Sequence, residues 1–134
     1  MRNPFLMLCL VLVFAVAGCV RQGVDPEGAA AAPQLFPCEV KTIGLPSSLL
    51  VAPPALGTAP SGFARVEVGL ENQSTLKVTV LHSVEWFDSE GFSLPTVMAR
   101  QNRVVIPGHQ TYRITAVAPS AKAYRAVVTV SRSQ

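Results

Sequence analysis

The side chains that could do chemistry in this sequence are few, and they are widely spaced. After residue 37, the side chains that could ligate a soft metal are His82, His109, Cys38 and Met98. Their ligand types would suit copper, but no two lie at the short spacing of a metal-binding motif. Catalysis also needs a nucleophile, a base and an orienting group that meet in space. We therefore expect no catalytic residues, no metal and no other cofactor.

Two neighbouring carboxylates, Asp88 and Glu90, resemble an acid pair at first sight. They are followed by Gly91 and lie between two apolar stretches. Asp and Gly in such a place are typical of a tight, solvated turn. We interpret the pair as turn-forming.

Cys19 is a more specific signal. Arg2 gives a short positive start, and residues 5–17 form an apolar run that ends in Val16-Ala17-Gly18-Cys19. The run suits a secretion signal and is too short to span a membrane. The last four residues resemble the bacterial lipobox. This resemblance implies cleavage between Gly18 and Cys19, acylation of Cys19 and attachment to a membrane.

The residue after Cys19 is Val20 and not aspartate, which favours the outer membrane, facing the periplasm, over the inner membrane. Residues 19–37 are rich in Gly, Ala and Pro without apolar periodicity and are expected to form a flexible tether. The predicted organisation is a signal peptide over 1–18, a lipidated tether over 19–37 and one domain over 38–134.

Charge excludes one class of partner. The net charge is only +3, and the Lys and Arg residues are scattered. A nucleic-acid-binding protein needs a basic stripe, so we expect no nucleic acid. With Cys9 in the leader and Cys19 lipidated, Cys38 is left alone, and we expect a buried thiol and no internal disulfide.

The domain has the pattern of an all-β protein. Apolar and polar residues alternate along 76–87, which assigns Trp86 and every second residue before it, His82 included, to the core face. Residues 53–62 are expected to form a loop. Turn residues separate the apolar runs at regular spacing, which predicts an immunoglobulin-like antiparallel sandwich of about seven strands. The expected strands are 38–43, 48–52, 63–71, 76–87, 92–94, 104–106, 111–117 and 124–131.

Three stretches resemble the YcfL family of periplasmic lipoproteins. They are Val78–Val80 leading to Trp86–Gly91, then Val105–His109, then Pro119–Arg125. The resemblance covers roughly residues 63–131. It implies an immunoglobulin-like sandwich in the outer membrane, with no established reaction, and it includes a histidine at position 109.

A binding surface is therefore a better hypothesis than an active site. Loops on rigid sandwiches often carry function, and residues 95–103 contain Arg100 and Arg103, which could contact an acidic partner. With His109 they form the candidate binding surface. We expect a non-enzymatic adaptor that binds a protein or cell-wall component of the envelope. The alternatives are a structural subunit of a larger envelope or secretion assembly, or a ligand or metal carrier.

Overall fold

A computed structural model describes residues 36–133 of the chain. These residues form nine strands and one turn of 3-10 helix. The elements are β1 (Cys38–Ile43), β2 (Leu49–Val51), β3 (Ala55–Thr58), β4 (Ala64–Asn72), β5 (Val78–Phe87), β6 (Ser93–Leu94), η1 (Val97–Ala99), β7 (Asn102–Ile106), β8 (Thr111–Val117) and β9 (Arg125–Arg132).

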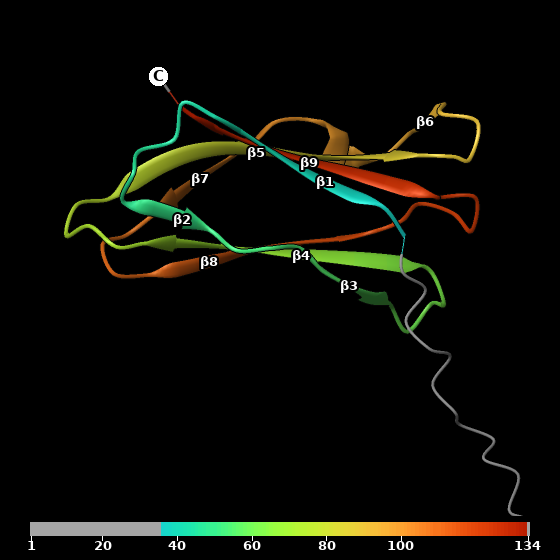
Figure 1. Cartoon of the computed structure of the whole chain (residues 1–134), viewed down its shortest axis with the longest axis horizontal. Coiled ribbons are helices and arrows are strands. Elements are labelled where there is room, and N and C mark those ends of the chain that lie inside the picture. The colour runs from blue at the N-terminus through green and yellow to red at the C-terminus, as the bar shows by residue number, and fades with distance from the viewer. Residues whose placement is uncertain (1–35, 134) are drawn as a thin grey trace, which may run out of the picture.

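The strands form two stacked sheets (Figure 1). One sheet has the order β1-β9-β5, and both β6 and β7 pair with the other side of β5. The second sheet is centred on β4, which pairs with β8 on one side and with β2 and β3 on the other. The predicted all-β sandwich is confirmed. The β1–β9 pair is parallel, whereas every other pair is antiparallel.

The core lies between the sheets and follows the alternation seen in the sequence. On β5 the side chains of Val80, Val84 and Trp86 are fully buried. They face the other sheet, where alternate residues of β4 and β8 are buried in the same way. This confirms the predicted core face and Trp86 as its marker. The remaining core residues of these two strands are Val66, Val68, Leu70, Ile114 and Ala116.

One predicted loop contains a strand. Within residues 53–62, Ala55–Thr58 pairs in antiparallel register with residues 64–67 of β4. The segment lacks the apolar alternation of a half-buried strand because its side chains are only partly covered. The structure of this segment is therefore set by backbone pairing with the edge of β4. Backbone pairing leaves no periodic pattern in the side chains, so the sequence did not predict the strand. With this strand, residues 36–133 contain nine strands, one more than the eight segments expected from the sequence.

The folded part begins before β1. The ring of Phe36 packs against that of Trp86 with centroids 5.4 Å apart, and the N–H of Ala126 donates to the carbonyl of Pro37 (3.0 Å). Phe36 and Pro37 therefore belong to the folded part, although they precede the predicted start of the domain at Cys38. The predicted cleavage and lipidation sites, Gly18 and Cys19, lie outside the described residues. Within residues 36–133, no helix is long and apolar enough to cross a membrane.

Candidate functional site

The candidate arginines lie where the chain enters β7. Thr96 caps the short turn η1 by accepting the N–H of Met98 on its hydroxyl (3.3 Å), and the N–H of Arg100 closes the turn on the carbonyl of Val97 (3.3 Å). Arg103 follows on β7, directly opposite Leu81 of β5. Both arginines are exposed, and neither forms an ion pair with another residue of 36–133.

His109 lies at the other end of β7, in the turn to β8. It is exposed, as expected. Its backbone has a positive φ of 58°, a conformation in which histidine is more frequent than most residues. Its N–H donates to the carbonyl of Ser74 (3.1 Å). The three predicted residues therefore follow the length of β7 and do not form one pocket.

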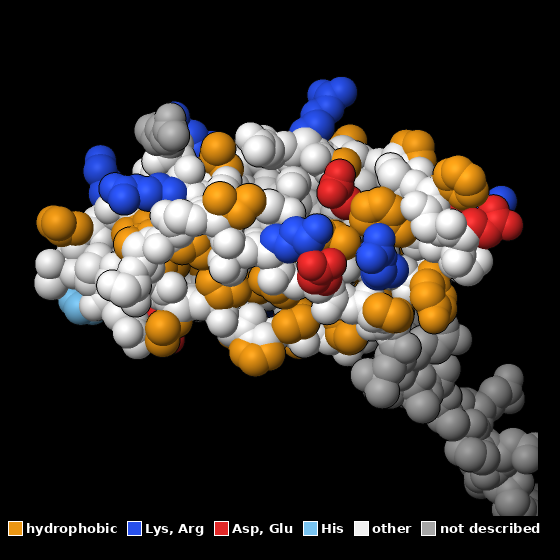
Figure 2. All heavy atoms as spheres, turned by 45° about the horizontal axis from the view of Figure 1, so that its top comes forward, with side chains coloured by type: hydrophobic (Ala, Val, Ile, Leu, Met, Phe, Trp, Pro, Cys, Tyr) orange, Lys and Arg blue, Asp and Glu red, His pale blue; other side chains and the backbone are white. Residues whose placement is uncertain are grey.

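Arg103 belongs to the outer face of the five-stranded sheet. The strand registers place Ile43, Ser131, Leu81 and Arg103 in one row across β1, β9, β5 and β7. Figure 2 shows this face, with Lys and Arg side chains at its left, at its top and in its middle, and with acidic side chains in its middle and at its right. At β7 the exposed residues Arg103 and Val105 make the sheet basic and partly apolar.

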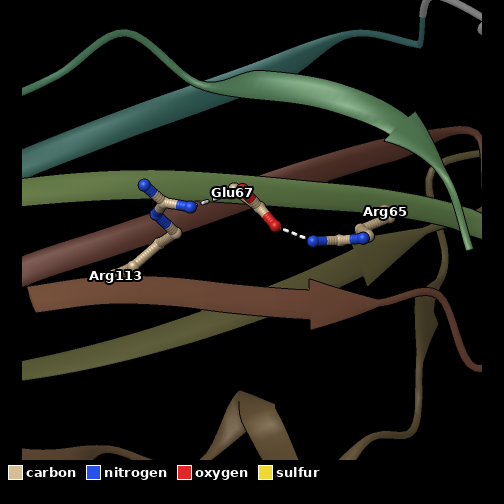
Figure 3. Close-up of polar contacts among 3 residues, drawn as sticks. All are labelled: Arg65, Glu67 and Arg113. Carbon is tan, nitrogen blue, oxygen red and sulfur yellow. Dashed lines mark hydrogen bonds and ion pairs between the residues drawn. The ribbon is translucent and has the colours of Figure 1, made fainter.

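A second charged group was not predicted. On the outer face of the four-stranded sheet, the carboxylate of Glu67 lies between two guanidinium groups (Figure 3). It contacts Arg65 of the same strand, and it lies 3.7 Å from Nη1 of Arg113 on β8. Glu67 is 21% exposed, whereas Arg113 is 69% exposed. Such surface ion pairs contribute little stability, about 0–1 kcal/mol.

This charged group borders a shallow hollow of about 250 Å³ that is lined by β3, Arg65 and Glu67. Arginine has five donors in a planar fork, so Arg113 keeps donors that could bind a further carboxylate. Arg65 and Glu67 stand two apart on one strand, which indicates a shared face. That Arg113 joins them depends on the pairing of β4 with β8, and no residue pattern in the sequence reports that pairing.

The histidine of the core is buried away from solvent. His82 is 4% exposed, and its ring packs on that of Tyr112 with centroids 5.8 Å apart. Burial lowers the pKa of His82 below its usual value, so the ring is neutral. It occupies the core position that the alternation predicts, but its buried Nδ1 has no hydrogen-bond partner among residues 36–133.

Cys38 is also poorly suited to chemistry. It is a free, half-buried thiol at the start of β1. Burial raises the pKa of Cys38, which disfavours the reactive thiolate. Cys38 is thus less buried than the sequence led us to expect. The raised pKa of its thiol keeps its reactivity low.

The other candidate chemical groups are dispersed or structural. In the described part of the chain, no three His, Cys, Asp or Glu side chains are grouped as a metal site. Oδ1 of Asp88 accepts the N–H groups of Glu90 (3.0 Å) and Phe92 (2.8 Å). The turn-forming role predicted for Asp88 is confirmed. The exposed cationic side chains of these strands and turns include Arg100, Arg103 and Arg113.

Comparison with known proteins gives a family for this sequence and two solved structures with a similar fold. The sequence model of a family described as "Protein of unknown function (DUF1425)" matches residues 40–132. A crystal structure of a DUF1425 family member from Shewanella sp. pv-4 is similar, with a TM-score of 0.56 and 21% identity over 64% of this chain and 79% of that one. Campylobacter jejuni cj0090 is similar with a TM-score of 0.56 and 24% identity, over 74% of this chain and 100% of that one. A search of curated proteins found no significant match. The two structures support the sandwich fold.

Proposed function

Because this chain belongs to the DUF1425 family, whose function is unknown, we propose a function from its own residues. The protein is a lipid-anchored lipoprotein of the bacterial envelope, in the outer membrane and facing the periplasm. Its sandwich binds the acidic groups of another envelope component, a protein or a cell-wall polymer, and catalyses no reaction.

The anchor is supported by the sequence around Cys19. An apolar run with a positive start leads into small residues and a cysteine at the position of a lipobox. Each buried methylene of an acyl chain contributes about 0.8 kcal/mol, so several chains on one cysteine give a stable attachment.

The observation that carries the binding role is the state of Arg100 and Arg103. Both are exposed, and neither forms an ion pair within residues 36–133. Arg103 lies on a strand of the sandwich, so its backbone is held in place before a partner arrives. Guanidinium groups bind carboxylates and phosphates in a two-pronged geometry. The region around β7 is therefore suited to binding an acidic partner.

The anchor is tested by fractionating cells that produce the full chain or Cys19→Ser. The wild-type chain should sediment with membranes, and the variant should move to the soluble fraction. Retention of the variant in membranes would contradict the lipid anchor.

The binding surface is tested by in-cell cross-linking of the full chain, followed by affinity capture and mass spectrometry. Arg100→Glu/Arg103→Glu should lose a partner that the wild type captures. The control Lys77→Glu/Lys122→Glu makes the same charge change at two exposed lysines that also lack ion pairs within the described residues, and it should keep that partner. Equal capture by both double variants would overturn the surface. A wild type that captures no component would overturn the binding role.

A further inference from the structure

Among residues 36–133, β8 pairs only with β4, so it is an edge strand and half of its backbone hydrogen-bonding groups have no partner there. Just beyond its two ends, the N–H of Asn72 donates to the carbonyl of Gln110 (3.0 Å), and that of Ala118 donates to the carbonyl of Ala64 (2.8 Å). Residues of an antiparallel strand alternate between facing their neighbour and facing away. The even-numbered residues therefore bond to β4. The N–H and C=O groups of Thr111, Arg113, Thr115 and Val117 point to the free edge.

The other edges are shorter, interrupted or more highly charged. β2 and β3 are separated by Pro53-Pro54, β6 has two residues and β7 has five. β1 carries Glu39 and Lys41 at alternate positions. Such features block pairing with other strands. β8 has seven residues in unbroken register, without proline, and its single charge lies near Glu67.

We propose that β8 pairs antiparallel with β8 of a second copy of this chain, in the register centred on Ile114. The two four-stranded sheets then become one continuous sheet. The eight edge-facing residues of the two strands supply about eight backbone hydrogen bonds. This inference concerns self-association and does not rest on the proposed function.

The side chains select this register. Thr111 lies opposite Val117 of the second copy, and Arg113 lies opposite Thr115, so no like charges face each other. On the core side, the large Tyr112 lies opposite the small Ala116. A register centred on Arg113 would place two arginines directly opposite one another, which destabilises a strand pair. A register centred on Thr115 would leave Thr111 and Tyr112 beyond the end of the partner strand, and so shorten the ladder.

Cysteine pairs in the full chain test the register. Directly opposite residues in a hydrogen-bonded pair lie at a Cα separation that a disulfide can bridge. Thr111→Cys/Val117→Cys should therefore give a covalent dimer when diamide is added to cells. Neither single variant should form this dimer. Its introduced cysteine and the same cysteine of the second copy would lie six residues apart along the ladder, about 20 Å. All variants also carry Cys38→Ser.

The double variant should form on the order of tenfold more dimer than either single variant, because positioned thiols react at a raised effective concentration. Absence of a dimer, or an equal yield from the single variants, would overturn the proposal. So would capture of a different protein by the double variant in place of a second copy.

A proline variant distinguishes a dimer formed by pairing of the β8 edges from one formed by chance collision of two copies. Thr115→Pro removes an N–H that bonds to nothing within the sheet, so the fold should tolerate it, but it should abolish the dimer of the double variant. The matched control is Val105→Pro on β7. The carbonyl of Thr79, opposite Val105, accepts from Ser133 on the β9 side, so the N–H of Val105 also faces outward. This control should keep the dimer. Loss of the dimer in both variants, or in neither, would contradict pairing through β8.

Discussion

The imidazole ring of His82 packs against the phenol ring of Tyr112, with centroids 5.8 Å apart and the ring planes inclined at 45°. His82 belongs to β5 and Tyr112 to β8, so the contact joins the two sheets. Asn102 and Val130 lie opposite His82 on the two neighbouring strands, and neither is a charged partner for an imidazolium. The neutral ring is therefore the form that the fold accepts.

This contact predicts a loss of stability in acid. The pKa of His82 is lowered in the fold, so the unfolded chain takes up the proton first. The contribution of the neutral His82 ring to the free energy of unfolding is complete above the pKa of histidine in the unfolded chain, about 6.5. This contribution falls as the pH drops toward the lower pKa of the folded protein. Thermal unfolding measured between pH 7.5 and 5 should show a falling midpoint, and His82→Leu should flatten that dependence. His109→Gln, at the exposed histidine, should leave it unchanged. An unaltered slope in His82→Leu would contradict this assignment.

Phe36 should be part of the cooperative fold. It is 8% exposed and packs on Trp86. Truncation of a buried phenylalanine leaves a cavity, so Phe36→Ala should lower the free energy of unfolding by about 3 kcal/mol. Phe92→Ala is the matched control, because that ring is 67% exposed, and its effect should stay within about 0.5 kcal/mol. Urea denaturation measures both, and equal midpoints would place Phe36 outside the fold.

Asn72 holds one end of the sandwich together. It is fully buried, and its amide donates to the carbonyls of Leu76 (2.8 Å), Ile106 (3.1 Å) and Pro107 (3.1 Å). Asn72→Asp keeps the shape but places a carboxylate, which cannot donate when ionised, against those carbonyls. We expect a loss of about 3 kcal/mol in urea denaturation. Gln73→Ala, at the exposed neighbour, should cost little. A wild-type midpoint for Asn72→Asp would show that the donor is dispensable.

Gly108 should be intolerant of any side chain. A Cβ at this position would lie 2.3 Å from the carbonyl oxygen of Thr75, a backbone atom. Gly108→Ala must therefore separate the β7–β8 turn from the β4–β5 turn, and we expect a loss of about 2 kcal/mol or more. Gly57→Ala has open space around the new methyl group and should leave the unfolding temperature the same or slightly higher. Similar unfolding temperatures for the two variants would contradict the close packing of the turns.

Much of the fold could be predicted from alternation, because a half-buried strand must place apolar side chains on one side. The core face of β5 and the positions of β8 and β9 follow from that requirement. The candidate site was harder to predict. Arg100, Arg103 and His109 were predicted as an exposed set, and the structure confirms that they are exposed but spreads them along β7.

The sequence by itself determined which residues face the core and where most chain reversals occur, because side-chain period and turn chemistry are local properties. Only the tertiary structure decided which strands are neighbours. The parallel pairing of β1 with β9, the β3 strand, the meeting of Glu67 with Arg113 and the open edge of β8 all depend on contacts between distant segments. Such contacts are selected by the joint packing of two sheets, so no single stretch of sequence encodes them.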